Sequence, residues 1–408
     1  MSEQENTTTV SDNKTTDNPK DKTNGLANGG MPNLNMIKSG GRFLTTRVGE
    51  NKIFCKESFS DDERNEWINY FRSYQDEETG LFCDPNAESR VVDERHDKVH
   101  LDRQLTTFCI SALECLNSSS LYPLNFLNEF YDKEYFVNYL QDLNWGNAWN
   151  SGNKVMFIGI CAIYNYEKFQ DQESKVMLDN WLEWMDANQN NDTGFWGNTT
   201  ATQYFNGMGG FYHQFVIYNY LNRSVNHWKK IVDRHIYLQL RDGGFNPEGG
   251  GAACDDIDGI DPLVHFYHQH DYRRDDIKVV LKKTLDLILS SQNNDGGFYW
   301  SKHYWYNFTP YFGLILDAIT KRDSYYTYLC ARGLLRGQKK DLIKQGVLTG
   351  WSKPDRKERE SSLFDTWLRC TTIGEICSVL DQEPIAKVKM NFLKAPGVGW
   401  FNADKSKF

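Results

Sequence analysis

The apolar residues of this chain follow a helical pattern from about residue 60 onward, where they recur at spacings of three and four. Short turns rich in Gly, Asn and Asp separate these segments. No stretch shows the sustained alternation of apolar and polar residues that is typical of a sheet. The pattern therefore predicts an all-α protein.

One theme recurs along the chain: an amphipathic helix, a Gln, three or four polar residues, a Gly and then an aromatic residue. Neighbouring glutamines lie 48 to 66 residues apart, and a period near 50 holds two helices and two turns. The second copy is the loosest, because Trp149 lies three residues beyond Gly146. The glutamines are Gln75, Gln141, Gln189, Gln239 and Gln292.

A second, more apolar helix is predicted after each copy, and a sixth after a divergent turn at 346–351. Such inner helices bury their apolar faces only by stacking on their neighbours. Six outer–inner pairs predict a single (α/α)6 toroid of six helical hairpins over residues 39–408. Residues 1–38 are polar, and we expect them to form a disordered tail. The predicted inner segments are 100–116, 153–166, 203–221, 254–267, 305–319 and 362–380.

The repeat resembles the QW motif of terpenoid cyclases and the related repeat of protein prenyltransferases. The fifth copy has a basic residue, an apolar helix, Gln, Gly and an aromatic residue in the expected order, with Phe in place of the usual Trp. The resemblance covers most of residues 60–380 and implies an α/α toroid. Because this fold carries unrelated chemistries, the resemblance does not identify the reaction. The matching residues are Lys283, Leu287, Ile288, Gln292, Gly296 and Phe298.

The stretch GGGAACDDIDGIDPL (249–263) is the most acidic junction between a turn and an inner helix. Squalene-cyclase-like enzymes carry an acidic DxDD motif at such a place, and Asp256 and Asp258 match its first and middle aspartates, whereas Gly259 replaces the last. The resemblance implies that Asp258 is the proton donor. The zinc site of prenyltransferases needs an Asp-x-Cys pair, and none occurs here.

The spacing of the aspartates also indicates acid chemistry without the resemblance. Asp255, Asp258 and Asp261 share one helix face. Crowded carboxylates raise at least one pKa, and a carboxylic acid that stays protonated near neutral pH is suited to general acid catalysis. We therefore expect Asp258 to be the acid and Asp256 or Asp261 to tune it. An alternative remains open, in which these residues cap the helix start and are solvated.

Several polar residues are predicted near the starts of inner helices. His213 is a candidate general base, and Arg103, beside His100 and Asp102, is a candidate ligand for a substrate carboxylate or sulfate. A packed, hydrogen-bonded role is the alternative for each histidine. The remaining candidates for a polar, sugar-stacking rim are Trp196, Asn206, Trp305, Tyr306, Asp365 and Trp367, for which capping or core packing is the alternative.

Composition narrows the class of partner. A formal net charge of −9 argues against a nucleic-acid partner, and no apolar run is long enough to predict a transmembrane segment. Nine cysteines without framework spacing indicate buried thiols in a reducing compartment, so we expect a cytoplasmic protein. The histidines of HFYHQH (265–270) lack a metal-site context, and we expect neither a metal nor a cofactor.

Three functional hypotheses follow. The first is an enzyme, of hydrolase or lyase type, that performs acid–base chemistry on a glycan or glycoconjugate in the central cavity. The second is a terpenoid-cyclase-like enzyme in which Asp258 protonates an isoprenoid. The third is a non-catalytic toroid that binds a glycan or a protein. The sequence does not determine the substrate or the oligomeric state.

Overall fold

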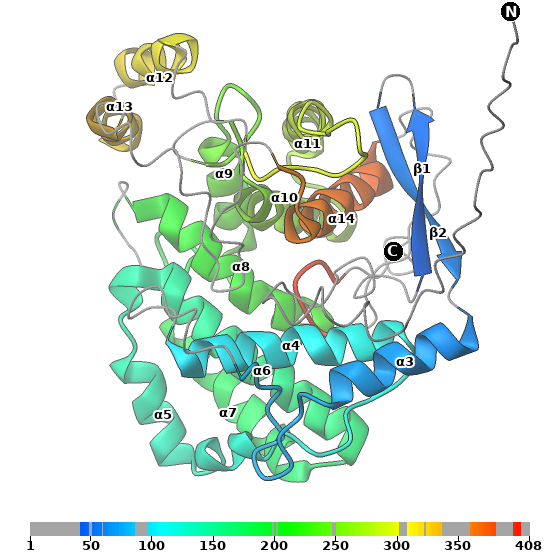
Figure 1. Ribbon diagram of the computed structural model, residues 1–408. Coiled ribbons are helices and arrows are strands. Elements are labelled where there is room, and N and C mark those ends of the chain that lie inside the picture. Colours follow the sequence, from blue (N-terminus) through cyan, green and yellow to red (C-terminus); the bar gives the residue numbers. More distant parts are fainter. Residues whose placement is uncertain are drawn as a thin grey trace, which may run out of the picture.

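The chain is mostly helical in the computed structural model (Figure 1). The predicted tail and the candidates Trp305 and Tyr306 lie outside the residues that the structure describes. The described residues are 41–48, 51–58, 60–85, 97–197, 200, 203–246, 250–301, 308–321, 324–336, 360–380 and 395–400.

All six predicted inner segments are confirmed as helices, and each observed helix agrees with its predicted range within a few residues. The predicted inner segments correspond to α4 (Lys98–Cys115), α6 (Ala148–Phe169), α8 (Tyr204–Tyr220), α10 (Ala253–Gln269), α12 (Phe308–Lys321) and α14 (Leu363–Val379). The other helices are α3 (Asp61–Arg72), α5 (Lys133–Asp142), α7 (Gln172–Asn188), α9 (Trp228–Leu238), α11 (Arg274–Leu289) and α13 (Ser324–Arg336), with the short 3₁₀ helices η3 (Asn125–Phe130) and η4 (Trp145–Asn147).

A two-stranded hairpin precedes the helices, and the sequence analysis did not predict it. Strands β1 (Gly41–Val48) and β2 (Asn51–Ser58) pair antiparallel, with Gly41 opposite Ser58 and Val48 opposite Asn51. Both strands contain aromatic and β-branched residues, which favour extended backbone. Their apolar residues do not alternate regularly, so the period-two signal of a half-buried strand is missing.

The repeat theme has one structural cause, which is a glutamine that bridges a tight turn. In four copies the Gln side-chain amide donates to the carbonyl oxygen of the repeat's own glycine, and that glycine has a positive φ that favours Gly. In the loosest copy Gln141 is exposed. The bridges are Gln75–Gly80 (3.0 Å), Gln189–Gly194 (2.7 Å), Gln239–Gly243 (3.2 Å) and Gln292–Gly296 (3.0 Å).

The aromatic residue that ends a repeat is fastened to the following inner helix. The backbone amide of Phe82 donates to Thr106 Oγ1 (2.9 Å), and the amide of Phe298 donates to Thr366 Oγ1 (2.9 Å). In the fourth copy the same contact goes from the amide of Phe245 to Asp256 Oδ1 (3.0 Å). Asp256 therefore occupies the place that a threonine hydroxyl has in two other repeats.

Five of the inner helices contact one another in succession: α4 packs on α6, α6 on α8, α8 on α10 and α10 on α14. The succession returns to its start through aromatic rings, because Phe108 of α4 meets Trp367 of α14 edge-on, with ring centroids 5.8 Å apart. The core lies between these helices and the outer ones, and Figure 1 shows α7, α9 and α11 around the outside.

The segment predicted as the fifth inner helix does not take that position. Helix α12 packs on α13, and this pair lies beside α9, where the Tyr326 hydroxyl donates to the carbonyl oxygen of Tyr237 (2.7 Å; Figure 1). On α12 the side chains of Phe312 and Ile319 are 62% and 66% exposed, unlike those of an inner helix. Helix α10 packs directly on α14 instead.

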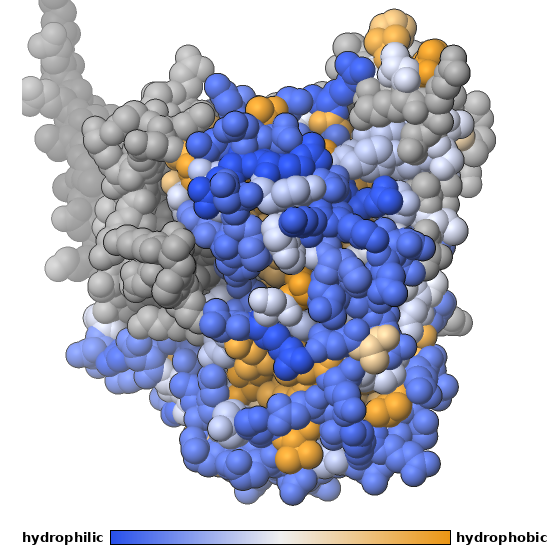
Figure 2. All heavy atoms as spheres, turned by 180° about the vertical axis from the view of Figure 1, so that it is seen from behind, coloured by the Kyte–Doolittle hydropathy of each residue, from blue (hydrophilic) through white to orange (hydrophobic). Residues whose placement is uncertain are grey.

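The face opposite to the view of Figure 1 is largely hydrophilic, with apolar side chains gathered in its lower half (Figure 2). Within the described residues, no helix combines the length and apolar character needed to cross a membrane.

Gly259 provides a test of the packing between α10 and the preceding turn. A Cβ at this position would lie 2.6 Å from the ring of Phe245, which is fully buried. We expect Gly259→Ala to lower the free energy of unfolding by about 1–3 kcal/mol through overpacking, measured by urea denaturation.

The matched control is Gly313→Ala in α12, where the added methyl would meet only the side chain of Arg241 at 3.0 Å. A methyl on a helical glycine with room around it is neutral or mildly stabilising. Equal losses of stability in both variants would contradict the proposed contact with Phe245.

Candidate active site

The aspartates of α10 are buried rather than solvated. Asp255, Asp256, Asp258 and Asp261 are 4%, 0%, 2% and 2% exposed. The cap residue is Ala252, which makes no side-chain capping contact. The alternative of a solvated, capping acidic cluster is therefore wrong for this helix.

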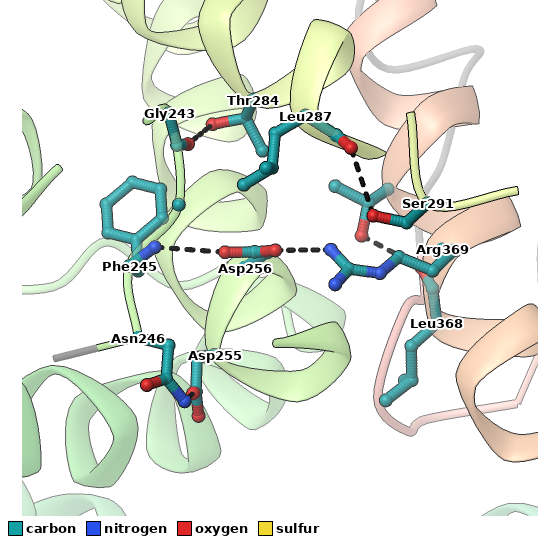
Figure 3. A network of polar contacts seen from close by, with 12 residues as sticks. Gly243, Phe245, Asn246, Asp255, Asp256, Thr284, Leu287, Ser291, Leu368 and Arg369 are labelled. Carbon is teal, nitrogen blue, oxygen red and sulfur yellow. Dashed lines mark hydrogen bonds and ion pairs between the residues drawn. The ribbon is translucent and has the colours of Figure 1, made fainter. Parts of the chain in front are cut away.

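Asp256 holds α10 to the neighbouring inner helix (Figure 3). One carboxylate oxygen accepts the amide of Phe245, and the other is ion-paired with Arg369 Nη1 of α14. Arg369 also donates from Nη2 to the carbonyl oxygen of Trp300 (2.8 Å), and both charged side chains are fully buried. Burial raises the pKa of Asp256, and the charge of Arg369 opposes this rise. Asp256 is thus an anchor between two helices and a turn.

Asp255 points to the other side of the same turn, away from Arg369 (Figure 3). Its Oδ2 accepts a hydrogen bond from Asn246 Nδ2 (2.6 Å). Burial, followed by the charge of Asp256, raises the pKa of Asp255 to about 7. Near neutral pH this carboxyl group is therefore close to half protonated.

Asp258 lies between Asp255 and Asp261 on the same helix face, and its Oδ2 is buried without a hydrogen-bond partner. Burial raises its pKa well above the usual range, and the charges of Asp255 and Asp261 add to this effect. Pro262, four residues later, has no backbone N–H, so the carbonyl of Asp258 has no helical donor. Burial and the neighbouring charges both favour the protonated form of this carboxyl group.

Asp261 connects α10 to α8. Its Oδ2 accepts a hydrogen bond from the hydroxyl of Tyr212 (3.3 Å), and its Oδ1 lies 3.2 Å from Nε2 of His265. That imidazole nitrogen is 2.8 Å from Asn219 Nδ2, also on α8. Burial raises the pKa of Tyr212 well above its usual range, with the charge of Asp261 as the second cause. Tyr212 therefore remains a neutral hydrogen-bond donor.

Helix α14 contributes two further fully buried acids, Asp365 and Glu375. Asp365 accepts a hydrogen bond from the hydroxyl of Ser362 (2.6 Å), whose oxygen caps the amide of Asp365 (3.1 Å). The charge of Glu375 is a further cause of the raised pKa of Tyr212, so Glu375 lies in the neighbourhood of that hydroxyl group. Tyr212, Arg369 and Glu375 were not among the residues predicted for the site. A lone Arg and a lone Glu in the apolar segment 362–380 were the signal that was available.

His213, the candidate base, faces α6 rather than the acidic cluster. The centroid of its ring lies 5.9 Å from that of Trp149 in an edge-on contact. Its Nδ1 would lie 3.2 Å from a Cβ atom added at Gly152 of α6. Burial lowers the pKa of His213 to about 3, so the imidazole is neutral at physiological pH. The structure does not bring His213 together with Asp258.

Arg103, beside His100 and Asp102, was predicted to bind a substrate carboxylate or sulfate. In the structure each of these three residues of α4 contacts a different neighbour. The ring of His100 packs edge-on against Phe157. Asp102 pairs with Lys98, whereas Arg103 pairs with Glu129 (2.8 Å). Arg103 also lies over the rings of Phe126 and Phe130, at 5.6 Å and 5.3 Å from their centroids.

The described members of the predicted sugar-binding rim are packing or capping residues. Trp196 is 1% exposed, stacks on Phe211 and donates from Nε1 to the carbonyl oxygen of Met185 (2.7 Å). Asn206 accepts the amide of Trp149 (3.1 Å), and Trp367 is 8% exposed. Trp196, Asn206 and Trp367 thus make packing or capping contacts, which were named as the alternative to sugar binding. Trp196 has no exposed ring face on which a sugar could stack.

No group of three or more His, Cys, Asp or Glu side chains within the described residues has a geometry that would hold a metal ion. Of the histidines in HFYHQH, His265 belongs to the contact with Asp261, and His268 Nε2 lies 3.0 Å from Ser378 Oγ on α14. The cluster is therefore an arrangement of acids and hydrogen-bonding side chains.

Comparison with known proteins adds no identification, because no family model, no curated protein and no solved structure matches this chain.

The ion pair of Asp256 and Arg369 predicts a large effect on stability. Arg369→Met would leave a buried carboxylate without its partner, and we expect a loss of about 3–5 kcal/mol in the free energy of unfolding. Adding Asp256→Asn to that variant should recover part of the loss, because the uncompensated charge is gone. A double-mutant cycle by urea denaturation measures the coupling, and additive effects would contradict the pairing.

The raised pKa of Asp255 predicts a pH dependence of stability. Between pH 4 and 7 the folded state holds a proton that the unfolded state has released, so stability falls as the pH rises through about 7. The contribution has an upper bound of about 4 kcal/mol. Asp255→Asn should therefore gain stability relative to the wild type between pH 4 and pH 8, measured by urea denaturation at both values.

Asp76 is a control of opposite sign, because hydrogen bonds from Thr79 hold the pKa of this exposed carboxyl group below its usual value. Asp76→Asn should lose stability relative to the wild type as the pH rises toward the usual pKa of 3.8, with little further change above it, so this control is measured below pH 4 as well. The same direction of change in both variants would contradict the raised pKa of Asp255.

Proposed function

We propose that this chain is an enzyme that uses Asp258 as a general acid on a polar substrate of the glycan class. The observation that carries this proposal is the buried Oδ2 of Asp258, which has no hydrogen-bond partner. Burial and two neighbouring carboxylates favour its protonated form through a raised pKa. A protonated carboxyl oxygen that has no internal hydrogen-bond partner has a proton available for a substrate oxygen.

The neighbours of Asp258 favour a polar substrate over an isoprenoid. Tyr212, Asp255, Asp261 and Glu375 all contribute polar groups to the cluster. A cyclase that stabilises a carbocation needs walls that are almost wholly apolar and aromatic. The terpenoid-cyclase-like role and the purely binding role are the alternatives that the turnover experiment below distinguishes from this proposal.

Asp261 is the natural partner of Asp258 in this proposal. The two residues are three apart on α10, which puts their Cβ atoms about 5–6 Å apart. That separation is on the scale of carboxylate pairs in glycosidases. Asp258 would protonate the leaving oxygen, and Asp261, oriented by Tyr212, would act on the opposite side or tune the acid. Asp256 contributes its charge but is held by Arg369.

We also propose that the helices form an α/α toroid. The support is the succession of contacts from α4 through α6, α8 and α10 to α14, with Phe108 meeting Trp367. Five inner helices account for this circuit, and the six-hairpin form would require α12 to enter between α10 and α14. A cytoplasmic location stays a proposal from cysteine usage.

Asp258→Asn is the direct test of the acid. We expect the variant to lose 10²–10⁴-fold in kcat on the glycan that the wild type turns over, because the amide has no proton of comparable acidity to donate. The measurement is a turnover screen with a glycan panel and an isoprenoid panel, run in parallel on both proteins.

The matched control is Asp286→Asn, which removes an exposed carboxylate on the outer helix α11. It should keep wild-type turnover. Equal glycan turnover in the Asp258 variant would remove Asp258 from the mechanism. Turnover of isoprenoids alone would favour the cyclase-like role, and binding of a glycan without turnover would favour the non-catalytic role.

A further inference from the structure

Residues 395–400 (APGVGW) lie far from α8 in sequence but contact α8 and α14 in space. Figure 1 shows this segment as the red loop between α14 and α8. Ala395, Pro396, Gly397 and Gly399 are buried, and a turn between the amide of Trp400 and the carbonyl oxygen of Gly397 (3.0 Å) holds its shape. The segment thus occupies space inside the circle of helices.

Gly399 makes the central contact of this segment. Its amide donates to the hydroxyl oxygen of Tyr212 (3.1 Å), and that hydroxyl in turn donates to Asp261 (3.3 Å). Gly399 has a φ of 76°, and a Cβ there would lie 2.6 Å from Thr371 Cγ2 of α14. Only glycine fits this position without displacing its neighbours.

The second contact is made by Trp400, whose ring meets that of Tyr220 on α8 edge-on, with centroids 5.1 Å apart. Residues 395–400 are therefore fastened to α8 by one hydrogen bond to a side chain and by ring packing. No ladder of backbone hydrogen bonds joins the described residues of this segment to the helices around it.

We propose that residues 395–400 are a plug that holds the place of the substrate and must leave before a substrate reaches the acidic cluster. This inference rests on the proposed function of Asp258. Gly399 contacts Tyr212, the hydrogen-bond donor to Asp261, and in this structure Asp255, Asp258 and Asp261 are at most 4% exposed, so a substrate does not reach them. A proton donor that acts on an external molecule therefore requires an open state.

The contact with Tyr212 indicates what takes the place of the plug. The hydroxyl oxygen of Tyr212 accepts a hydrogen bond from the Gly399 amide while its proton is directed to Asp261. When Gly399 leaves, that oxygen is free to accept a hydrogen bond from a hydroxyl or an N–H group. A substrate rich in hydroxyl groups satisfies this acceptor, whereas a hydrocarbon does not. Tyr212 is thereby a positioning residue for a polar substrate.

Gly399→Val tests the plug in the full-length protein. The larger side chain cannot adopt the observed backbone next to Thr371, so the segment should leave while the helices remain folded. A water-soluble carbodiimide with glycine ethyl ester labels accessible carboxyl groups, and peptide mass spectrometry reads each site. We expect labelling of Asp258 and Asp261 to rise at least 10-fold over the wild type, with Asp256 unchanged because Arg369 holds it.

Gly194→Val is the matched control for general loosening. Gly194 also has a positive φ (79°), and a Cβ there would lie 2.7 Å from Ile231 Cγ1, but the residue lies in an outer turn. This variant should lose thermal stability without a rise in labelling of Asp258. An equal rise in both variants, or no rise in either, would overturn the plug.

Hydrogen exchange of the wild-type protein gives a second measurement that does not depend on any variant folding. The amides of residues 397–400 should exchange at least 100-fold faster than those at the centre of α10, since the plug opens without unfolding the helices. Exchange of both at one common rate would overturn the inference.

Turnover assays separate the plug from the proposed function. If the plug opens and Gly399→Val raises glycan turnover, both ideas are supported. If labelling rises but no variant turns over any substrate, the plug as a gate to the cluster stands, and the proposed chemistry of Asp258 fails. If Asp258 acts as the acid but labelling does not change, only the plug is excluded.

Discussion

The ion pair between Asp256 and Arg369 is the constraint on which the centre of this protein depends. It joins α10 to α14 across the position where a repeat copy does not enter the circle of helices. Asp256 also accepts the amide of Phe245, so one carboxylate fastens a turn and two helices. A buried charge without its partner would strongly destabilise the fold, so this pair is tolerated because both charges are present and hydrogen-bonded.

The pairing of Asp256 determines the chemistry of its neighbours. Arg369 directs its charge to Asp256, and Asp255, Asp258 and Asp261 are left in a buried environment with little positive charge. For Asp255 and Asp258, such an environment favours the protonated form by raising the pKa. A hydrogen bond from Asn246 offsets part of the cost of burying Asp255, and a hydrogen bond from Tyr212 does the same for Asp261. Oδ2 of Asp258 has no such partner. The candidate acid thus keeps a buried oxygen without a hydrogen-bond partner.

The resemblance to the acidic motif of squalene-cyclase-like enzymes has a structural limit at Gly259. That residue faces the ring of Phe245 and not the acidic cluster, so an aspartate there would meet the wedge of the repeat. The first position of the motif, Asp256, serves the repeat as Thr366 does in α14. Position in a motif and role in the fold therefore differ, even where the residues match.

The sequence by itself determined the helices, the repeat and the acidic face. A helical period, a bridging Gln and a turn Gly are local properties, and they were enough to locate all six predicted segments as helices, although α12 does not take an inner place. The hairpin β1–β2 was not predicted, because its apolar residues do not alternate.

Tertiary structure alone decided which groups meet. The place of α12 beside α9, the pairing of Asp256 with Arg369, 113 residues apart, and the contact of Gly399 with Tyr212, 187 residues apart, depend on how distant segments pack. The same holds for His213 and Arg103, whose side chains face away from the acids. Local patterns carry no information about such contacts, because the free energy that selects them comes from burial and charge pairing between segments that only the folded chain brings together.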